Sequence, residues 1–331
     1  MDLRPTHVAH SFQEEFGGRF EGKRVMVTGA TGFVGTNLCR ALRALGAEVA
    51  GVALADSLLH APDPDGILAA DLTDEASART TVQAIQPEMV FHLAGMVDTR
   101  QSTELVLPTL AHNLMGAVHL MTALVGTGCQ RVVVVTSSET PRAGQTPNSP
   151  YAASKLAMVS YAEMYWALYG LPVVIARPHM VFGPHQPPDK LIPYLIRCGL
   201  ENTPPRLAGG KRLCDPVYVM DFVRAMLEMA TEDRALGMTL DVGTGVGLSV
   251  AEIASRVLSL TGATAAPVFG AIPDRLGEAP QVADLASTQA LLTWTPAWSF
   301  DDAIRETIEW YAARSELLPG AHPPTRREVQ E

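Results

Sequence analysis

Thr28-Gly-Ala-Thr-Gly-Phe-Val-Gly35 is the stretch that decides the fold of this 331-residue chain. It places Gly29, Gly32 and Gly35 between an apolar strand pattern that begins at Arg24 and a helical pattern that follows. Glycines at this spacing permit a tight turn and let backbone N–H groups at the helix N-terminus meet a pyrophosphate. The stretch predicts a dinucleotide-binding turn, and the alternative interpretation is a glycine turn that holds no ligand.

Strand and helix patterns alternate from Lys23 onward, which predicts a parallel sheet covered by helices on both faces. The expected elements are Arg24 to Thr28, Val34 to Leu45, Glu48 to Ala53, Ile67 to Ala70, Asp74 to Ile85, Met89 to Leu93, Thr103 to Val125, Arg131 to Thr136, Tyr151 to Tyr169 and Pro172 to Ala176. The β-branched run Arg131 to Thr136 is the most apolar strand and is expected at the centre. Between Pro178 and Pro216, frequent prolines favour loops shaped around a ligand.

Four parts are therefore expected along the chain, which we assign to the α/β fold class. Residues 1–22 form an N-terminal arm. Residues 23–177 form an NAD(P)-binding domain with a doubly wound parallel sheet of the Rossmann type, which residues 239–260 complete. Residues 178–318 form mainly a smaller C-terminal, substrate-binding lobe, and residues 319–331 form a disordered tail.

Composition excludes several classes of protein. The formal net charge of -10 comes without any Lys/Arg block, so nucleic acid is not an expected partner. The cysteines lie far apart without C-x-x-C spacing, and the histidines show no metal-ligand spacing, which predicts no metal site and no disulfide framework. We expect no signal peptide and no membrane span, because no run of about 18 apolar residues exists. A reducing cytoplasm fits best.

A second motif, Tyr151-Ala-Ala-Ser-Lys155, opens an apolar helix. Residues four positions apart share one face of a helix, and an ammonium near a phenol favours its phenolate form. Lys155 can also hydrogen-bond the nicotinamide ribose. Ser137 and Ser138 follow the central strand, whose carboxyl end faces the ligand crevice of an open α/β sheet, so a serine can share a substrate proton with Tyr151. Chance explains an isolated Y-x-x-x-K, but the combination indicates a nicotinamide-dependent oxidoreductase.

The adenosine end of the cofactor is less clearly marked. A Rossmann-type site usually has an acidic residue about 20 residues beyond the glycines, on the ribose. Asp56 lies a few residues late, Ala53 occupies the likelier position, and no arginine stands ready for a 2′-phosphate. NAD is favoured, with NADP as the alternative. Asp71 and Asp74, after the third strand, reach the adenine edge or merely cap the next helix.

Taken together, these segments resemble the extended short-chain dehydrogenase/reductase family, in particular its sugar-nucleotide epimerases, dehydratases and reductases. The resemblance runs from about Phe20 to Tyr311. Besides the two motifs above, it rests on Phe91-His-Leu-Ala-Gly95, Asn113, Thr136-Ser-Ser138, Ala176-Arg-Pro178, Val181-Phe-Gly-Pro184, Asp215-Pro-Val-Tyr-Val-Met-Asp221 and Trp294-Thr-Pro296 through Glu309-Trp-Tyr311.

The resemblance implies a set of cofactor contacts and a catalytic group. The cofactor contacts are Gly29, Gly32, Phe33, Val34, Gly35, Asp71, Leu72, Leu93, Ala94, Gly95, Asn113, Thr136, Lys155 and Pro178. Tyr151 is the expected acid/base, assisted by a serine. The pattern Thr136-Ser-Ser selects Ser138, which we prefer. Matching the Thr-Ser-Glu of some dehydratases selects Ser137 instead and makes Glu139 an elimination acid rather than a loop carboxylate.

The resemblance also implies a nucleotide-sugar substrate. Met180 stands where the family often has an asparagine, and Cys214 stands where an arginine usually meets the diphosphate. Arg275 matches the other arginine expected there, or is a solvated surface charge, and Arg212 substitutes for the lost one. The expected substrate contacts are Arg275, His179, Arg212 and Tyr218.

The implied reaction is transfer of a hydride from a sugar carbon, usually carbon 4, to NAD while Tyr151 removes the hydroxyl proton. We expect an NDP-hexose 4-epimerase of the epimerase/dehydratase type, working through a keto intermediate. The alternatives are an NAD(P)H-dependent NDP-4-keto-6-deoxyhexose reductase and, in another class, a dinucleotide-sensing or scaffold protein. A binder needs no phenolate, so the motif argues against the last. The aromatic helix Tyr151 to Tyr169 and the helix Thr103 to Val125 are expected to form a homodimer interface rather than ordinary core.

Overall fold

The computed structural model describes residues 12–59, 61–142, 144–274, 277 and 280–314 of the chain. Within them the chain forms two compact units. The first unit contains the described residues of 12–178, 222–242 and 284–294, and the second contains those of 179–221, 243–283 and 295–314. The segment predicted as mainly a second lobe therefore contributes to both units.

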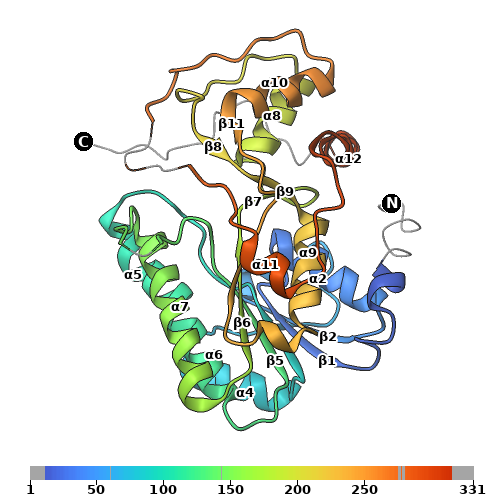
Figure 1. The fold of residues 1–331 in the computed structure, drawn as a ribbon, viewed down its shortest axis with the longest axis vertical. Coiled ribbons are helices and arrows are strands. Elements are labelled where there is room, and N and C mark those ends of the chain that lie inside the picture. The colour runs from blue at the N-terminus through green and yellow to red at the C-terminus, as the bar shows by residue number, and fades with distance from the viewer. Residues whose placement is uncertain (1–11, 60, 143, 275–276, 278–279, 315–331) are drawn as a thin grey trace. The chain divides into compact units, whose positions relative to one another are not determined.

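The first unit is built on one seven-stranded sheet with the strand order β10-β6-β5-β4-β1-β2-β3 (Figure 1). Its neighbouring strands all pair in parallel. The strands are β1 (Arg24–Thr28), β2 (Glu48–Ala53), β3 (Ile67–Ala69), β4 (Met89–His92), β5 (Arg131–Val135), β6 (Val173–Pro178) and β10 (Thr239–Val242). The order reverses between β1 and β4, and ligands in open α/β sheets bind at such a switch point. The predicted doubly wound parallel sheet is confirmed.

Helices cover both faces of this sheet. In Figure 1, α6 and α7 lie on one side of it and α2 and α9 lie on the other. The α-helices of this unit are α2 (Phe33–Ala44), α3 (Ala55–Leu58), α4 (Glu75–Ile85), α5 (Val106–Thr109), α6 (Gly116–Leu124), α7 (Pro150–Tyr169), α9 (Val219–Met229), which begins in the second unit, and α11 (Ala286–Leu291), with a 3₁₀ turn η3 (Asp233–Ala235). In the described part of the chain, none of the helices has the length and apolar character that crossing a bilayer requires.

The core lies mainly between the sheet and the helices α6 and α7. The predicted central strand β5 is flanked by β4 and β6 and buries Val132, Val133 and Val134 completely. Leu120 and Met121 of α6 pack in the same cluster of buried side chains. A strand covered on both faces has a continuous run of apolar residues, and this run allowed the sequence to predict β5 as the central strand.

The segment predicted as one helix from Thr103 to Val125 is instead built in four pieces. It begins as a 3₁₀ turn η1 (Thr103–Leu105), continues as α5, widens into a π-helical stretch η2 (Leu110–Met115) and ends as α6. Such widened turns are rare and occur frequently at functional sites. The prediction of a single regular helix was wrong, and Asn113 lies in the widened stretch.

Helix α7 begins and ends where its sequence signals place it. The Ser149 side chain accepts the N–H of Ala152 (3.1 Å), and Pro150 occupies the first turn, where its missing N–H costs nothing. Gly170 ends the helix with a left-handed φ of 65°. These caps fix Tyr151 in the first turn.

The part of the N-terminal arm that is described packs on the first unit. Residues 12–16 are helical, and Phe12, Phe16 and Phe20 are buried. The Glu15 carboxylate accepts two hydrogen bonds from the Arg224 guanidinium of α9 (2.8 and 3.1 Å). This part of the arm therefore contributes both apolar burial and an ion pair to the unit.

The second unit contains two small β-ladders and three helices. The strands β7 (Met180–Phe182) and β9 (Pro216–Tyr218) pair in parallel, β8 (Leu213–Cys214) and β11 (Leu248–Ser249) pair antiparallel, and the helices are α8 (Leu191–Leu200), α10 (Val250–Thr261) and α12 (Phe300–Ala312). The buried Asp215 carboxylate accepts N–H bonds from Thr244 (2.7 Å), Gly245 (2.9 Å) and Ala283 (3.1 Å). The Asp215 side chain thereby connects its own segment to the turn at Thr244 and Gly245 and to the segment at Ala283.

The first turn of α2 leaves no room for a side chain at Gly35. A Cβ there would clash with the carbonyl oxygen of Gly29 and would lie 2.9 Å from the Cα of Ala30. Backbone atoms cannot rotate away as a side chain can. A Cβ on Gly116 in α6 would instead lie 3.6 Å from its nearest neighbour, on Leu72, which is an ordinary contact.

We expect Gly35→Ala to lower the free energy of unfolding by about 1–3 kcal/mol, because the overpacked backbone must shift. The matched control Gly116→Ala is expected to be neutral or stabilising, since alanine favours a helix over glycine by up to about 1 kcal/mol. Urea unfolding followed by circular dichroism measures both variants. A Gly35→Ala protein as stable as the wild type would contradict the described turn.

Candidate active site

The glycine turn between β1 and α2 has the geometry of a phosphate cradle. Gly29 has a φ of 68° and donates its N–H to the Val52 carbonyl (2.8 Å). A Cβ on Gly29 would lie 2.9 Å from the nitrogen of Ala94, so only glycine fits. The cap residue of α2 is Gly32, and no side chain caps the helix. The first N–H groups of α2 are therefore open to an anion, which the helix dipole also favours, and the cradle fits the pyrophosphate of a dinucleotide.

The carboxyl end of β2 offers no carboxylate to a ribose. A Cβ on Gly51 would lie 2.8 Å from the side chain of Ala30 in the glycine turn. Ala53, two residues further along the strand, presents its side chain on the same face. Asp56 lies beyond the strand, exposed in the first turn of α3. Ala53 therefore stands where dinucleotide-binding sheets usually present an acidic residue.

The acidic residues after β3 both have local partners. Asp71 accepts the N–H (2.9 Å) and the hydroxyl (2.8 Å) of Thr73, and these hydrogen bonds lower the pKa of Asp71 from its ordinary value. Asp74 accepts the N–H of Ala76 (2.9 Å) and caps α4. The sequence left open whether these aspartates reach the adenine or cap the next helix, and Asp74 is the one that caps it. Asp71, which is exposed, and Leu72, which is buried, lie just after the end of β3.

Asn113 joins the loop after β4 to α7. Its side-chain oxygen accepts the Met96 N–H (2.7 Å), and its amide donates to the Met96 carbonyl (3.1 Å) and to the Ser154 hydroxyl (3.0 Å). A Cβ on Gly95 would lie 2.7 Å from the same Asn113 oxygen. The π-helical stretch thus places the Asn113 side chain where it hydrogen-bonds both with Met96 and with Ser154 of α7. Ser154 was missed in the sequence, although it stands inside the Tyr151–Lys155 motif.

Tyr151 is buried, and its phenol hydrogen-bonds with Ser137. The Ser137 oxygen also accepts the N–H of Glu139 (3.1 Å). Burial raises the pKa of Tyr151 to about 12, the Ser137 hydrogen bond opposes this, and the Glu139 carboxylate adds to it. Ser137, the first serine of the pair, therefore contacts the tyrosine.

Ser138 lies one residue further along and has a backbone bond of its own. Its N–H donates to the Pro178 carbonyl at the end of β6 (2.9 Å). The Thr136 hydroxyl, just before the serines, is buried and hydrogen-bonds with the Thr140 hydroxyl (2.8 Å). These bonds fix the register in which Ser137 faces the phenol.

Lys155 of α7 is buried, and its ammonium lies at the end of β5. Its ammonium donates to the Val135 carbonyl (2.9 Å) and lies 3.9 Å from the Met158 sulfur. Burial lowers the pKa of Lys155 to about 8. The sequence predicts that this ammonium lowers the pKa of Tyr151 and so favours the phenolate. In the structure burial has the larger effect and raises the pKa of the phenol, because burying a charge costs free energy.

His92 at the end of β4 belongs to the core. Its Nδ1 hydrogen-bonds with the Thr28 hydroxyl (2.8 Å), whose oxygen also accepts the Ala94 N–H (3.1 Å). Burial, with a smaller effect of the nearby Lys155 charge, lowers the pKa of His92 to about 3. The imidazole is therefore neutral.

The expected substrate contacts fall in the second unit. His179 and Tyr218 are buried, Arg212 is partly exposed, and Arg275 lies outside the described residues. Tyr218 packs between Phe182 and Trp298, with ring centroids 5.8 and 4.9 Å away. Its aromatic packing is a sufficient reason for its burial.

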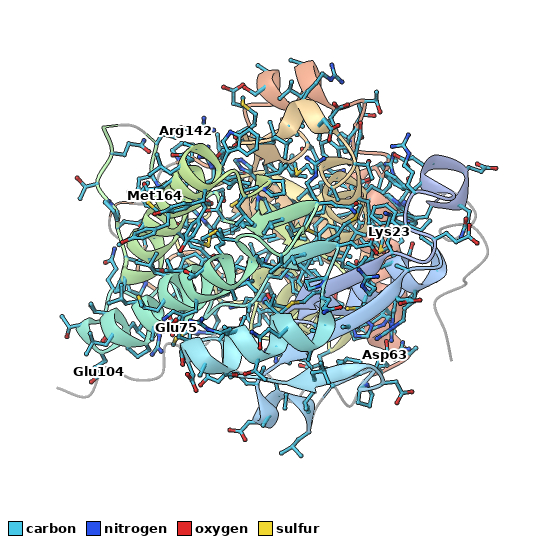
Figure 2. All side chains as sticks on the ribbon, turned by 90° about the horizontal axis from the view of Figure 1, so that it is seen from below. Lys23, Asp63, Glu75, Glu104, Arg142 and Met164 are labelled. Carbon is cyan, nitrogen blue, oxygen red and sulfur yellow. The ribbon has the colours of Figure 1, made fainter. Side chains whose placement is uncertain are left out.

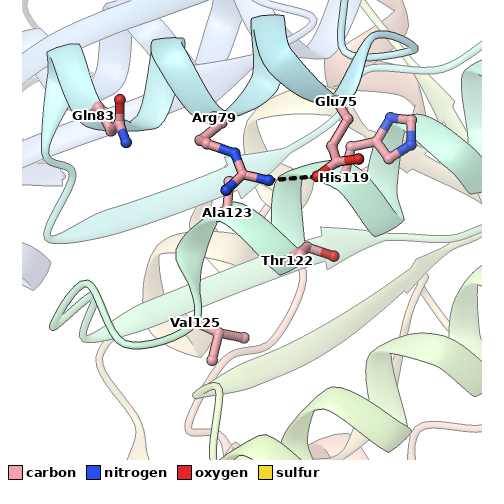
Figure 3. A pocket seen from close by; sticks show the side chains of 7 residues that line it. All are labelled: Glu75, Arg79, Gln83, His119, Thr122, Ala123 and Val125. Atoms are coloured by element: carbon pink, nitrogen blue, oxygen red, sulfur yellow. Dashed lines mark hydrogen bonds and ion pairs between the residues drawn. The ribbon is translucent and has the colours of Figure 1, made fainter.

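A groove on the first unit is lined in part by His119, whose ring Nδ1 hydrogen-bonds with the Leu72 carbonyl (3.0 Å). Figure 3 shows that it runs between α4 and α6, where Arg79 pairs with Glu75 (2.5 Å). Its lining residues are Glu75, Arg79, Gln83, His119, Thr122, Ala123 and Val125. Within the described residues, no group of three His, Cys, Asp or Glu side chains is placed to hold a metal ion.

Comparison with known proteins agrees with this site. Residues 25–243 match the model of the NAD dependent epimerase/dehydratase family. The chain is similar to a UDP-glucose 4-epimerase of Mycolicibacterium smegmatis (31% identical, covering 88% of this chain and 100% of the relative) and to a probable dTDP-glucose 4,6-dehydratase of Sinorhizobium fredii (28%, covering 87% and 92%).

A solved structure has the same fold. The Thermus thermophilus UDP-glucose 4-epimerase, in complex with NAD, is 26% identical and superposes with a TM-score of 0.77 over 87% of this chain and 98% of the other. Its sheet and the one described above share a Rossmann architecture. With the glycine cradle, the Tyr151–Lys155 motif and the family match together, the chain belongs to the NAD dependent epimerase/dehydratase family and is an enzyme with NAD as its cofactor.

Proposed function

We propose that this enzyme is a 4-epimerase that oxidises a nucleotide-diphosphate hexose at carbon 4 and reduces the keto intermediate on its other face. The observation that carries the proposal is the hydrogen bond between Ser137 and the buried Tyr151 phenol, in the unit that contains the dinucleotide cradle. The relative from Mycolicibacterium smegmatis, a UDP-glucose 4-epimerase, supports the reaction type.

The residues proposed to hold NAD lie along the carboxyl edge of the sheet. Gly29, Gly32, Phe33, Val34 and Gly35 take the pyrophosphate on the open N-terminus of α2. Asp71 and Leu72 flank the adenine, and the loop that Asn113 clamps borders the rest of the cofactor. The contacts proposed there are Leu93, Ala94, Gly95, Thr136, Lys155 and Pro178. Bound NAD supplies the hydride acceptor and a positively charged ring.

Tyr151 is the proposed acid/base. As a phenolate it removes the proton from the sugar hydroxyl, and as a phenol it returns that proton. The Ser137 hydroxyl donates to the phenol oxygen and stabilises the ionised form, which burial alone disfavours. Lys155, held by the Val135 carbonyl, keeps an ammonium at the same edge. We assign the assisting role to Ser137 rather than Ser138 on this contact.

A dehydratase is the second candidate, and Glu139 is the observation that favours it. The Glu139 carboxylate lies close enough to Tyr151 to raise the pKa of its phenol. A carboxylate beside the reacting carbon chain is the group that elimination of water requires. Product analysis separates the two reactions, because an epimerase gives a hexose of the same mass and a dehydratase gives a 4-keto-6-deoxy sugar.

The remaining alternatives differ in their use of the cofactor. An epimerase or dehydratase regenerates NAD in each turnover, and protein that releases NAD on denaturation supports either. A reductase consumes added NADPH or NADH with a 4-keto sugar. A dinucleotide sensor or scaffold converts no sugar nucleotide, whatever it binds.

We expect Tyr151→Phe to lower kcat by about 10²–10⁴-fold, the usual contribution of a general acid/base. The matched control Tyr161→Phe changes an exposed phenol of the same helix and is expected to keep full activity. Conversion of UDP- and dTDP-hexoses, followed by chromatography, measures both. Undiminished turnover by Tyr151→Phe, with NAD still bound, would remove Tyr151 from the mechanism.

The pH dependence of the reaction tests the serine assignment. Oxidation requires the phenolate, so kcat/KM rises with pH through the pKa of Tyr151. The Ser137 hydrogen bond lowers that pKa, and its loss in Ser137→Ala therefore moves the rising limb to higher pH. Ser138→Ala is expected to leave the limb in place. A limb that moves only in Ser138→Ala would reverse the assignment.

We further propose that two chains form a homodimer through α5 and α7. These helices contact each other and leave apolar side chains exposed, among them Leu107 (73% exposed) and Leu168 (69%), with Tyr161 between them in sequence. Interfaces are enriched in such aromatic residues. Sedimentation velocity of the full chain is expected to give a dimer that Leu107→Glu weakens. A wild-type monomer at micromolar concentration would contradict this.

A further inference from the structure

The loop after β5 is fixed at two points to the carboxyl ends of neighbouring strands. The first point is the Ser138 N–H, which donates to the Pro178 carbonyl at the end of β6 (2.9 Å). The second is Arg142 (labelled in Figure 2). Its Nη2 donates to the Asp241 carboxylate near the end of β10 (2.8 Å). Both strands and the loop belong to the first unit.

Asp241 is a rigid partner for this arginine. Its side chain is only 4% exposed, and its carboxylate also accepts from Arg177 Nη1 (3.2 Å) and from the N–H of Asp284 (3.0 Å). Arg177 and Asp241 lie directly opposite each other in the β6–β10 pairing. A buried carboxylate must keep such partners, because an unpaired buried charge costs several kcal/mol. Arg142, half-exposed, reaches from the loop to this fixed point.

The loop from Ser137 to Arg142 carries the groups that lie near Tyr151. Glu139 lies between Ser138 and Arg142, and Ser137 immediately precedes them. The Ser137 carbonyl accepts the Thr140 N–H (3.0 Å), so the serine and the rest of the loop move together. We infer that Arg142 is a positioning residue, which sets the place of the Ser137 hydroxyl by holding the far end of its loop to Asp241.

This role rests on the proposed function. The expected loss of turnover on mutation of Arg142 comes from displacement of the Ser137 hydroxyl and not from the strength of the ion pair. Asp241 keeps the Arg177 guanidinium and the Asp284 N–H when Arg142 is lost, so loss of the half-exposed Arg142 is expected to leave the fold intact. A displacement of about 1 Å in a reacting group can nevertheless cost about 10²-fold in rate. The predicted signature is therefore a loss of turnover without a loss of stability or NAD binding.

The test compares Arg142→Gln, Arg142→Lys and the control Arg79→Gln. Arg79 is also an exposed arginine (58%, against 49% for Arg142), and its ion pair with Glu75 lies on α4. We expect Arg142→Gln to lower kcat about tenfold or more with KM and NAD affinity little changed, Arg142→Lys to recover most of the loss, and Arg79→Gln to match the wild type. Equal kcat in Arg142→Gln and wild type would overturn the inference, as would an equal loss in Arg142→Lys.

Hydrogen exchange of the NAD-loaded protein separates failure of this inference from failure of the proposed function. The Ser138 and Thr140 amides, both hydrogen-bonded in the loop, are expected to exchange faster in Arg142→Gln and unchanged in Arg79→Gln. Unchanged exchange in Arg142→Gln would overturn the inference even if no substrate had been identified. Faster exchange in a protein whose wild type converts no sugar nucleotide would support the anchoring and overturn the proposed function.

Discussion

Parallel pairing of the strands is the constraint on which the site depends. It brings the carboxyl ends of β1, β4, β5 and β6 to one edge, so that residues far apart in sequence share one surface. Gly29 follows β1, Gly95 follows β4 and Ser137 follows β5, and Asn113 ties the loop after β4 to α7. No single loop could place a phosphate cradle and an acid/base pair so rigidly.

Burial has the larger effect on the acid/base group itself. An ammonium beside a phenol lowers the pKa of the phenol, but removing the phenolate from water raises it. In this unit the second effect prevails, and Tyr151 has a pKa of about 12. The Ser137 hydrogen bond acts in the opposite direction, as the positive ring of NAD would when bound. The same burial lowers the pKa of Lys155 to about 8.

The sequence predicted the features that local signals specify. The glycine turn, the apolar strand β5 and the helix from Tyr151 to Tyr169 each have a short-range cause and are found where predicted, and the caps Ser149 and Gly170 bound that helix. The π-helical stretch around Asn113 was not predicted, because its widened turn serves a contact with the distant Met96 loop. The helix pattern alone carries no signal for it.

Other parts of the site depend on tertiary contacts that no pattern contains. Two adjacent serines offer the same hydroxyl, and the contact of Ser137 with Tyr151 depends on the course of the loop, which the Glu139 N–H and the Pro178 carbonyl help to hold. The pairing of Arg142 with Asp241 joins residues 99 positions apart. The burial that raises the pKa of Tyr151 follows from packing of the whole unit, so it could not be predicted from the sequence pattern either.

Incubation of the NAD-loaded enzyme with UDP-glucose that carries deuterium at carbon 4 tests the central claim most directly. If the hydride leaves carbon 4 and returns to its other face, nuclear magnetic resonance will show UDP-galactose with the deuterium retained at carbon 4. Deuterium found at carbon 6, or lost to solvent during turnover, would contradict the account.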